Sequence, residues 1–409
     1  MVVETGLGCR DRSETRLYIF KKEIFACRDR SRPIPTFLFY CKSNSLFLLA
    51  AIIQFMNLEE RIKSFALLGE ILRDLLNDND VVKSIGTGRE RSLLNTLIDN
   101  QQKHNTWFTP ENVRRALTAI ANELTEENLI KWTNAYPELH KKINPFRVGV
   151  IMAGNIPLVG YHDLLSVLIT GNNLVAKTSS KDSELIIYLT NILCSINPGF
   201  RKRIEFTEGT LTKFDVIIAT GSDNSSRYFD YYFGKYPNLI RKNRNSVAII
   251  EGDETGDELE SLGTDIFSYY GLGCRNVSKV YLPRGYDINS ISKRWDSFKE
   301  VITHSKYANN YDFNKAVYLV NKEPFYDTGY LLMKHDNHIS SPVSVLYFEY
   351  YESQEAVKEQ TELLKEKIQC VVGKHNIPFG KAQSPHLWDY ADGIDTIEFL
   401  LKKKLAGIL

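Results

Sequence analysis

Apolar and polar residues follow a helical spacing over residues 56–139. Asn57 and Glu60 have the spacing of a helix cap and its reciprocal partner, and Thr109 followed by Pro110 predicts a second helix start. The apolar positions that share one face of the first helix are Leu58, Ile62, Phe65, Gly69, Leu72 and Leu76. We therefore expect residues 56–139 to be mainly helical.

Beyond residue 145 the pattern changes to short apolar runs separated by helical segments. The runs that we expect to be strands cover residues 148–152, 173–177, 203–206, 214–219 and 246–250. Strands that alternate with helices predict a doubly wound α/β sheet of the Rossmann type. Ligands bind such sheets beyond the carboxyl ends of the strands, where we expect Asn155, Lys177 and residues 220–222.

Residues 269–276 (Tyr-Tyr-Gly-Leu-Gly-Cys-Arg-Asn) place a cysteine in a glycine-rich turn. A helix is expected over residues 257–268 before it, and an apolar run over 277–282 follows. Backbone N–H groups near a thiol in such a turn favour a nucleophile. The alternative is an ordinary tight turn with a small buried cysteine.

The length of 409 residues suits two domains. We expect a helical lead-in and cofactor-binding domain over residues 56–248, a catalytic α/β domain over 249–380 and a C-terminal segment over 381–409. Residues 1–55 show neither the apolar period of a helix nor that of a strand. We interpret them as an extension before a natural start at Met56. Their apolar run, residues 46–55, is too short to span a bilayer, although a membrane-surface anchor is an alternative.

The composition narrows the classes of function. A net charge of +1 gives no sign of nucleic-acid binding. The six cysteines show no CxxC spacing and the eight histidines no HExxH pair, so no metal site is expected. This cysteine usage favours a reducing, cytoplasmic location.

The order of the motifs resembles the aldehyde dehydrogenase superfamily and, within it, the LuxC-type acyl-CoA reductases. The matching motifs are residues 154–157 (Gly-Asn-Ile-Pro), 171–180, 220–222 (Thr-Gly-Ser), 243–246 (Asn-Arg-Asn-Ser), 271–274 (Gly-Leu-Gly-Cys) and 389–396. Cys274 lies about 50 residues beyond the Thr-Gly-Ser, as the nucleophile of the superfamily does. A GxGxxG fingerprint is absent, so the expected cofactor site does not depend on that motif.

The resemblance implies a role for each matching residue. Cys274 would attack a thioester carbonyl, and Asn155 with the Cys274 backbone N–H would form an oxyanion hole. The residues expected to bind the cofactor are Lys177, Ser180, Thr220, Gly221 and Ser222. Judged singly, Asn155 is equally well explained as a turn residue, and Lys177 as a solvated lysine at a strand end.

Departures from the family pattern refine the expected reaction. Oxidising members carry a water-activating glutamate where this chain has residues 240–244 (Ile-Arg-Lys-Asn-Arg), so hydrolysis to an acid is not expected. Members that prefer NAD have a glutamate where this chain has Ser180, so we expect NADPH. The resemblance also implies an acidic residue that holds the nicotinamide ribose, and this residue is replaced near residues 338–342 (His-Ile-Ser-Ser-Pro).

The resemblance thus implies NADPH-dependent reduction of an acyl-CoA to an aldehyde, with an acyl-protein synthetase as partner and a homo-oligomeric assembly. The alternatives are another acyl donor, such as an acyl-protein or acyl phosphate, and a non-catalytic scaffold of the same fold. A nucleophilic Cys274 should alkylate faster than the other cysteines. No general acid or base is evident, with His162, His304 and His338 as candidates.

Overall fold

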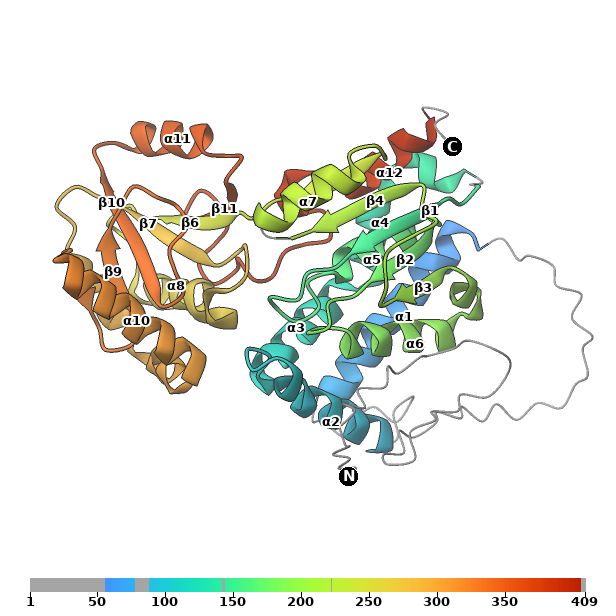
Figure 1. The fold of residues 1–409 in the computed structure, drawn as a ribbon, viewed down its shortest axis with the longest axis horizontal. Helices are drawn as coiled ribbons and strands as arrows, with labels where there is room; N and C mark the ends of the chain where they lie inside the picture. Colours follow the sequence, from blue (N-terminus) through green and yellow to red (C-terminus); the bar gives the residue numbers. More distant parts are fainter. Residues whose placement is uncertain (1–55, 78–87, 142–143, 222, 406–409) are drawn as a thin grey trace, which may run out of the picture. The chain divides into compact units, whose positions relative to one another are not determined.

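The computed structural model of the chain describes residues 56–77, 88–141, 144–221 and 223–405 (Figure 1). The interpretation of residues 1–55 as an extension, and the cofactor role expected of Ser222, lie outside these residues. The described residues belong to one compact unit.

Four helices open the described chain: α1 (Leu58–Leu76), α2 (Gly88–His104), α3 (Pro110–Glu123) and α4 (Glu126–Asn134). Asn57 and Glu60 cap α1 reciprocally, because Asn57 Oδ1 accepts from Glu60 N at 2.9 Å and Glu60 Oε2 accepts from Asn57 N at 2.8 Å. Thr109 caps α3 by accepting from the Asn112 N–H. The predicted helical character of this part is confirmed.

The first sheet has the strand order β3-β2-β1-β4-β5, with every pairing parallel. Its strands are β1 (Arg147–Ile151), β2 (Asn173–Lys177), β3 (Ile204–Thr207), β4 (Val216–Thr220) and β5 (Asn238–Arg241). The connecting helices are α5 (Tyr161–Ile169), α6 (Glu184–Ile196) and α7 (Asp223–Phe233). Because β1 pairs with both β2 and β4, the carboxyl ends of these three strands meet at one edge of the sheet.

One predicted strand belongs to the second sheet and not, as we had expected, to the first. The run over residues 246–250 was expected as the fifth strand of the first sheet, but β6 (Asn245–Ile249) lies in the second sheet, between β11 and β7. The fifth strand is instead β5, which pairs with β4. An apolar run predicts a buried strand without indicating its partner, and only three residues separate the two strands.

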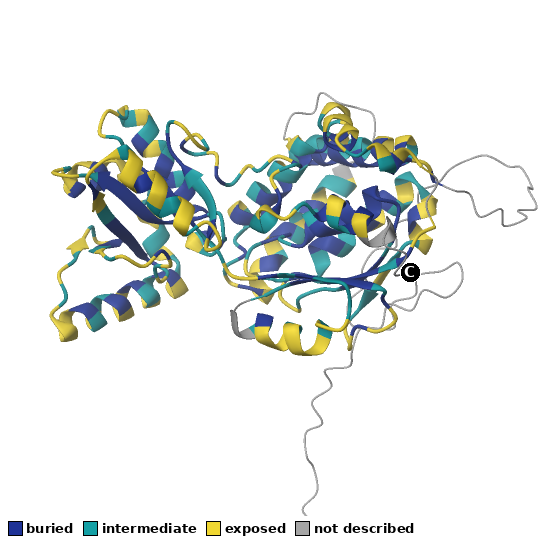
Figure 2. Ribbon diagram, turned by 90° about the horizontal axis from the view of Figure 1, so that it is seen from above, coloured by how far each residue is buried: buried dark blue, intermediate teal, exposed yellow. Residues whose placement is uncertain are grey.

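The second sheet has the order β11-β6-β7-β10-β9-β8 and is parallel except for the β8–β9 pair. Its other strands are β7 (Val277–Pro283), β8 (Tyr326–Asp327), β9 (Leu332–His335), β10 (Val345–Tyr351) and β11 (Ile368–Val372). The helices of this part are α8 (Gly256–Phe267), α9 (Ile288–Ser292), α10 (Ser305–Asn321) and α11 (Gln354–Leu363). The central strands β6, β7 and β10 are largely buried (Figure 2), and the α/β class with two sheets is confirmed.

Short 3₁₀ segments connect several of these elements. They are η1 (Pro137–His140), η2 (Pro198–Lys202), η3 (Ser268–Gly271), η4 (Lys293–Thr303) and η5 (Ala391–Gly393). Of these, η3 matters for the site, because it joins α8 to the turn that carries Cys274.

The C-terminal segment returns to the first sheet. Helix α12 (Thr396–Leu405) packs against α5, and the buried side chains that it and the preceding loop add to the first core are Leu387, Tyr390, Ile397, Leu400 and Leu401. Arg241 fixes this return, since its guanidinium pairs with Asp163 of α5 at 2.7 Å and donates to Thr396 Oγ1 at 2.8 Å. Within the described residues, every helix is too short or too polar to cross a membrane.

Candidate active site

Three consecutive residues before Cys274 adopt left-handed backbone angles. Tyr269, Tyr270 and Gly271 have φ values of 51°, 57° and 77°. Glycine tolerates this conformation, whereas each of the two tyrosines disfavours it by about 1–2 kcal/mol. The turn is therefore held by its surroundings, which include Asn112 of α3, whose Oδ1 accepts from the Tyr269 N–H at 3.2 Å.

Asn276 fastens the other side of the cysteine turn. Its buried Oδ1 accepts from Gly273 N at 2.8 Å, and its Nδ2 donates to carbonyl groups at the end of α8, those of Asp265 at 3.0 Å and Ser268 at 2.8 Å. The Asn276 N–H closes the turn by donating to Gly273 O at 3.0 Å. One buried amide thus fixes the backbone on both sides of Cys274. We call residues 268–276 the cysteine turn.

Asn155 lies against the cysteine turn. The Nδ2 of Asn155 donates to the Leu272 carbonyl, two residues before Cys274, at 2.9 Å. The neighbouring Ile156 is also close, since a methyl group added at Gly273 would lie 3.5 Å from Ile156 Cδ1. The structure therefore brings the turn after β1 and the cysteine turn together, as the sequence-based hypothesis requires. We call residues 154–158 the asparagine turn.

The surroundings of Cys274 keep its thiol protonated. Burial raises the pKa of Cys274 to about 11, and the nearby Arg275 opposes this rise only in part. The Ser246 hydroxyl donates to the Cys274 carbonyl at 2.9 Å and contacts Cys370 Sγ at 3.0 Å. Burial also raises the pKa of Cys194, in α6, to about 11, so the ligand-free protein gives Cys274 no electrostatic advantage over that cysteine.

The expected cofactor residues lie at the carboxyl edge of the first sheet. Lys177 ends β2 and Thr220 ends β4, while Ser180 is exposed in the turn after β2. Among the residues that the structure describes, the Lys177 ammonium has no ion-pair partner within 4 Å. At Gly221 any side chain would meet Phe229 and Ser225 of α7, each 2.8 Å from an added Cβ, so packing alone explains this glycine.

The three histidine candidates are engaged by structural contacts. His304 Nε2 bonds the Thr106 carbonyl at 2.9 Å, and its Nδ1 accepts from Tyr307 N at the start of α10. His162 is held by the Leu387 carbonyl at 2.9 Å, and burial lowers its pKa. His338 is exposed and pairs with Asp336 at 2.6 Å.

The segment that lacks the family's water-activating glutamate has a structural role here. Arg241 is buried and, besides Asp163 and Thr396, it donates to the Ala391 carbonyl at 2.6 Å. Arg244 pairs with Asp392 at 3.4 Å. These arginines tie the C-terminal segment to the sheets and offer no carboxylate for activating water.

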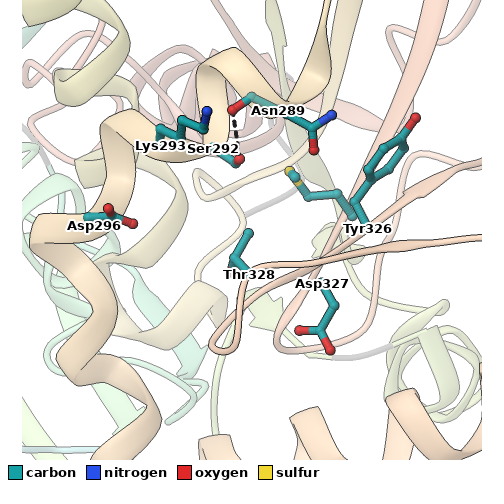
Figure 3. Close-up of a pocket in the computed structure, with 8 residues that line it drawn as sticks. Asn289, Ser292, Lys293, Asp296, Tyr326, Asp327 and Thr328 are labelled. Atoms are coloured by element: carbon teal, nitrogen blue, oxygen red, sulfur yellow. Dashed lines mark hydrogen bonds between the residues drawn. The ribbon is translucent and has the colours of Figure 1, made fainter.

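A hollow of about 200 Å³ in the second α/β part contains none of the predicted site residues. It is lined by Asn289, Ser292, Lys293, Asp296, Tyr326, Asp327, Thr328 and Met333 (Figure 3). Of its two acids, Asp327 is already paired with Lys315 at 2.7 Å and accepts from Gly329 N at 2.8 Å, and Asp296 accepts from the Tyr330 hydroxyl at 3.4 Å. We therefore do not place the chemistry there.

The fold is that of the aldehyde dehydrogenases. Aldehyde dehydrogenase 21 from Physcomitrella patens, solved with the reaction product succinate, superposes with a TM-score of 0.60 over 86% of this chain and 85% of that chain, at 11% identity. The NAD+ complex of an aldehyde dehydrogenase from Bacillus cereus gives a TM-score of 0.54 over 79% of this chain and 73% of that chain, at 12% identity.

In sequence the chain is similar to long-chain acyl-protein thioester reductases. The protein of that name from Aliivibrio fischeri is 25% identical over 221 residues, which are 49% of this chain and 45% of that protein. Long-chain acyl-protein thioester reductase 2 from Photobacterium leiognathi is 21% identical over 224 residues, 50% of this chain and 46% of that protein. The match thus covers less than half of each relative, and no protein-family model matches the chain. These similarities confirm the LuxC-type resemblance.

Two residues that organise the site were missed by the sequence analysis. Asn276 was quoted only as the last residue of the motif over residues 269–276, and its position two residues after Cys274 was the available signal. Asp182, whose Oδ2 accepts from Leu158 N at 2.7 Å, gave no signal, because its partner lies 24 residues away.

Proposed function

We propose that this protein reduces an acyl thioester to the corresponding aldehyde, with Cys274 as the nucleophile. The observation that carries the proposal is the hydrogen bond from Asn155 to Leu272, which sets an amide donor beside the cysteine turn. An asparagine amide has two N–H donors. One is used by the Leu272 carbonyl, and the other remains for an oxyanion that develops on a substrate attacked by Cys274.

The steps assigned to the chain follow from these positions. The Cys274 sulfur attacks the thioester carbonyl, and Asn155 donates to the oxygen as negative charge builds on it. Collapse of this species releases the substrate thiol and leaves the acyl group on the Cys274 sulfur. The segment 240–244 contains no acidic residue that could activate water, and the Asp163 carboxylate beside it is engaged by Arg241, so the acyl group is retained for reduction.

A nicotinamide cofactor fits the carboxyl edge of the first sheet. Lys177 and Ser180 would hold its ribose end, and Thr220 with Gly221 would flank the pyrophosphate. Bound there, the cofactor would supply a hydride to the acyl carbon, and the bond from that carbon to the Cys274 sulfur would then break to release the aldehyde and the cysteine. We favour NADPH because Ser180 presents no carboxylate to repel a 2′-phosphate, and the Lys177 ammonium is available to pair with it.

The acyl donor that we favour is a thioester on a protein rather than acyl-CoA. The sequence analysis expected acyl-CoA, whereas both sequence relatives are named for acyl-protein thioesters. Either donor presents the same carbonyl to Cys274, so the chemistry of the site does not distinguish them.

The test is NADPH and NADH oxidation by the full chain with long-chain acyl-CoAs and with an S-acylated carrier protein. We expect aldehyde formation that Cys274→Ala abolishes and Cys194→Ala preserves. Cys194 is the matched control, because burial raises its pKa to the same value and it lies in α6. Equal activity of Cys274→Ala and the unmodified chain would overturn the proposal.

A further inference from the structure

The asparagine turn is supported by contacts from outside it, chiefly from the neighbouring turn of residues 179–182. Leu158, a buried residue at its end, has a φ of 59°. This left-handed angle is disfavoured for leucine because its Cβ crowds the following carbonyl oxygen. Such a conformation persists where a surrounding group over-determines it.

The group that holds Leu158 is the Asp182 carboxylate. Asp182 precedes α6, and its Oδ2 accepts from the Leu158 N–H at 2.7 Å. The side chain is buried, with an exposed fraction of 5%. Its second oxygen, Oδ1, is buried with no hydrogen-bond partner among the described residues. A buried carboxylate kept with one oxygen unsatisfied costs stability.

The two turns also touch through Gly154. A methyl group added at Gly154 would lie 2.3 Å from Ser179 Oγ, and Ser179 forms a backbone bridge with Asp182. The turn of residues 179–182 therefore contacts the asparagine turn at both of its ends, with Asn155 between them.

We propose that Asp182 is a positioning residue for Asn155. By fixing Leu158 in its left-handed conformation, the carboxylate sets the path of the asparagine turn and so the direction of the Asn155 amide toward the cysteine turn. This inference deepens the proposed function and rests on it for its catalytic consequence. Its structural part, the dependence of the asparagine turn on Asp182, stands independently.

Only burial and the Leu158 N–H influence the ionisation of Asp182. Burial raises its pKa to about 7, and the hydrogen bond from Leu158 opposes that rise. The charged residues of its own segment and of α6 are Lys177, Lys181 and Glu184, and none of them contributes to the shift. The Leu158 N–H finds an acceptor in either protonation state of the carboxyl group, so an asparagine at this position is the conservative replacement.

The first experiment is hydrogen exchange of the peptide that spans residues 152–160, which needs no activity. We expect Asp182→Ala to speed exchange of the Leu158 amide by at least about tenfold, and Asp182→Asn to restore most of the protection. Asp215→Ala is the matched control, because Asp215 Oδ2 accepts from Arg147 N at 2.8 Å at the opposite end of β1. Unchanged exchange in folded Asp182→Ala would overturn the inference.

The second experiment is a double-mutant cycle on thioester reduction. We expect Asp182→Ala to lower kcat by about 10–100-fold with little change in KM, Asp182→Asn to recover most of it, and Asp215→Ala to stay within about twofold of the unmodified chain. In the Asn155→Ala background, Asp182→Ala should lower kcat by less than about a further twofold, because the amide that Asp182 positions is gone. Additive losses would overturn the positioning role. Absence of activity in the unmodified chain would count against the proposed function, while the exchange result still decides the structural part.

Discussion

The two turns that meet at the candidate site differ in where most of their support comes from. The cysteine turn is fastened largely by its own residue Asn276, whose amide bonds Gly273 and the end of α8. The asparagine turn depends on Asp182, 24 residues further along the chain. Both turns hold non-glycine residues at positive φ. A turn with internal support keeps its geometry when neighbouring segments move, whereas a turn with external support transmits such movement to Asn155.

The largest expected effect concerns the thiol of the cysteine turn. With a pKa of about 11, roughly one Cys274 in 10⁴ is a thiolate at pH 7, so the rate of alkylation by iodoacetamide should rise about tenfold per pH unit from pH 7 to 10. Peptide mass spectrometry would follow Cys274 and Cys194 in the same sample, and we expect parallel slopes. A plateau for Cys274 below pH 8 would show that the thiol is already activated without substrate, and would contradict only the raised pKa that burial gives it.

Removing the Asn155 amide tests the place where the two turns meet. We expect Asn155→Ala to lower kcat about 10²–10³-fold, which corresponds to about 2.7–4 kcal/mol of transition-state stabilisation. Steady-state kinetics with the best thioester would measure the loss. A fall of less than tenfold would mean that the oxyanion is stabilised by other donors.

The external support of the asparagine turn should make stability depend on pH. The pKa of Asp182 is raised from 3.8 to about 7 in the folded protein, so the unfolded chain releases this proton first as the pH rises. This contribution to the free energy of unfolding is greatest below about pH 4, falls between about pH 4 and 7, and is constant above, with a total change of about 4 kcal/mol. Urea unfolding at several pH values should show that Asp182→Asn lacks this change. Identical pH profiles for the two proteins would refute it.

Removing the internal support of the cysteine turn should cost less but act on both stability and rate. Asn276→Ala leaves buried carbonyl groups and the Gly273 N–H without a partner, which destabilises by about 2–3 kcal/mol. The midpoint temperature of thermal unfolding and the rate of thioester reduction should both decrease. Asn238→Ala is the matched control, since Asn238 Nδ2 also bonds nearby carbonyls, those of Phe233 and Tyr236. We expect it to lower stability without lowering activity of the folded protein, and an equal loss of activity would contradict a local role for Asn276.

The contrast between the turns also explains what could be predicted from the sequence. The strand over residues 173–177 and the capping pair Asn57–Glu60 were predicted correctly, because local periodicity and cap spacing determine them. The meeting of Asn155 with the cysteine turn followed from the order of the family motifs. The sheet to which β6 belongs could not be predicted, because strand partners far apart in sequence leave no mark on local periodicity.

The support that Asp182 gives was likewise beyond the sequence. An aspartate before a helix is commonly read as a helix cap, and here Ser183 occupies the capping position without a side-chain bond. The carboxylate instead faces a backbone N–H whose position depends on the left-handed angle of Leu158. The left-handed angle of Leu158 depends on tertiary packing, so the local sequence does not indicate it.

The return of the C-terminal segment to the first sheet has a consequence for synthesis on the ribosome. The indole of Trp132 donates to the Tyr390 hydroxyl at 2.7 Å, and Tyr136 donates to Asp395 at 2.5 Å, so partners separated by more than 250 residues close the first core. All five strands of that sheet are translated by residue 241, yet this flank stays uncovered until residues 387–401 have left the exit tunnel. The nascent chain therefore exposes apolar surface through the translation of the whole second sheet, the interval in which holding chaperones act.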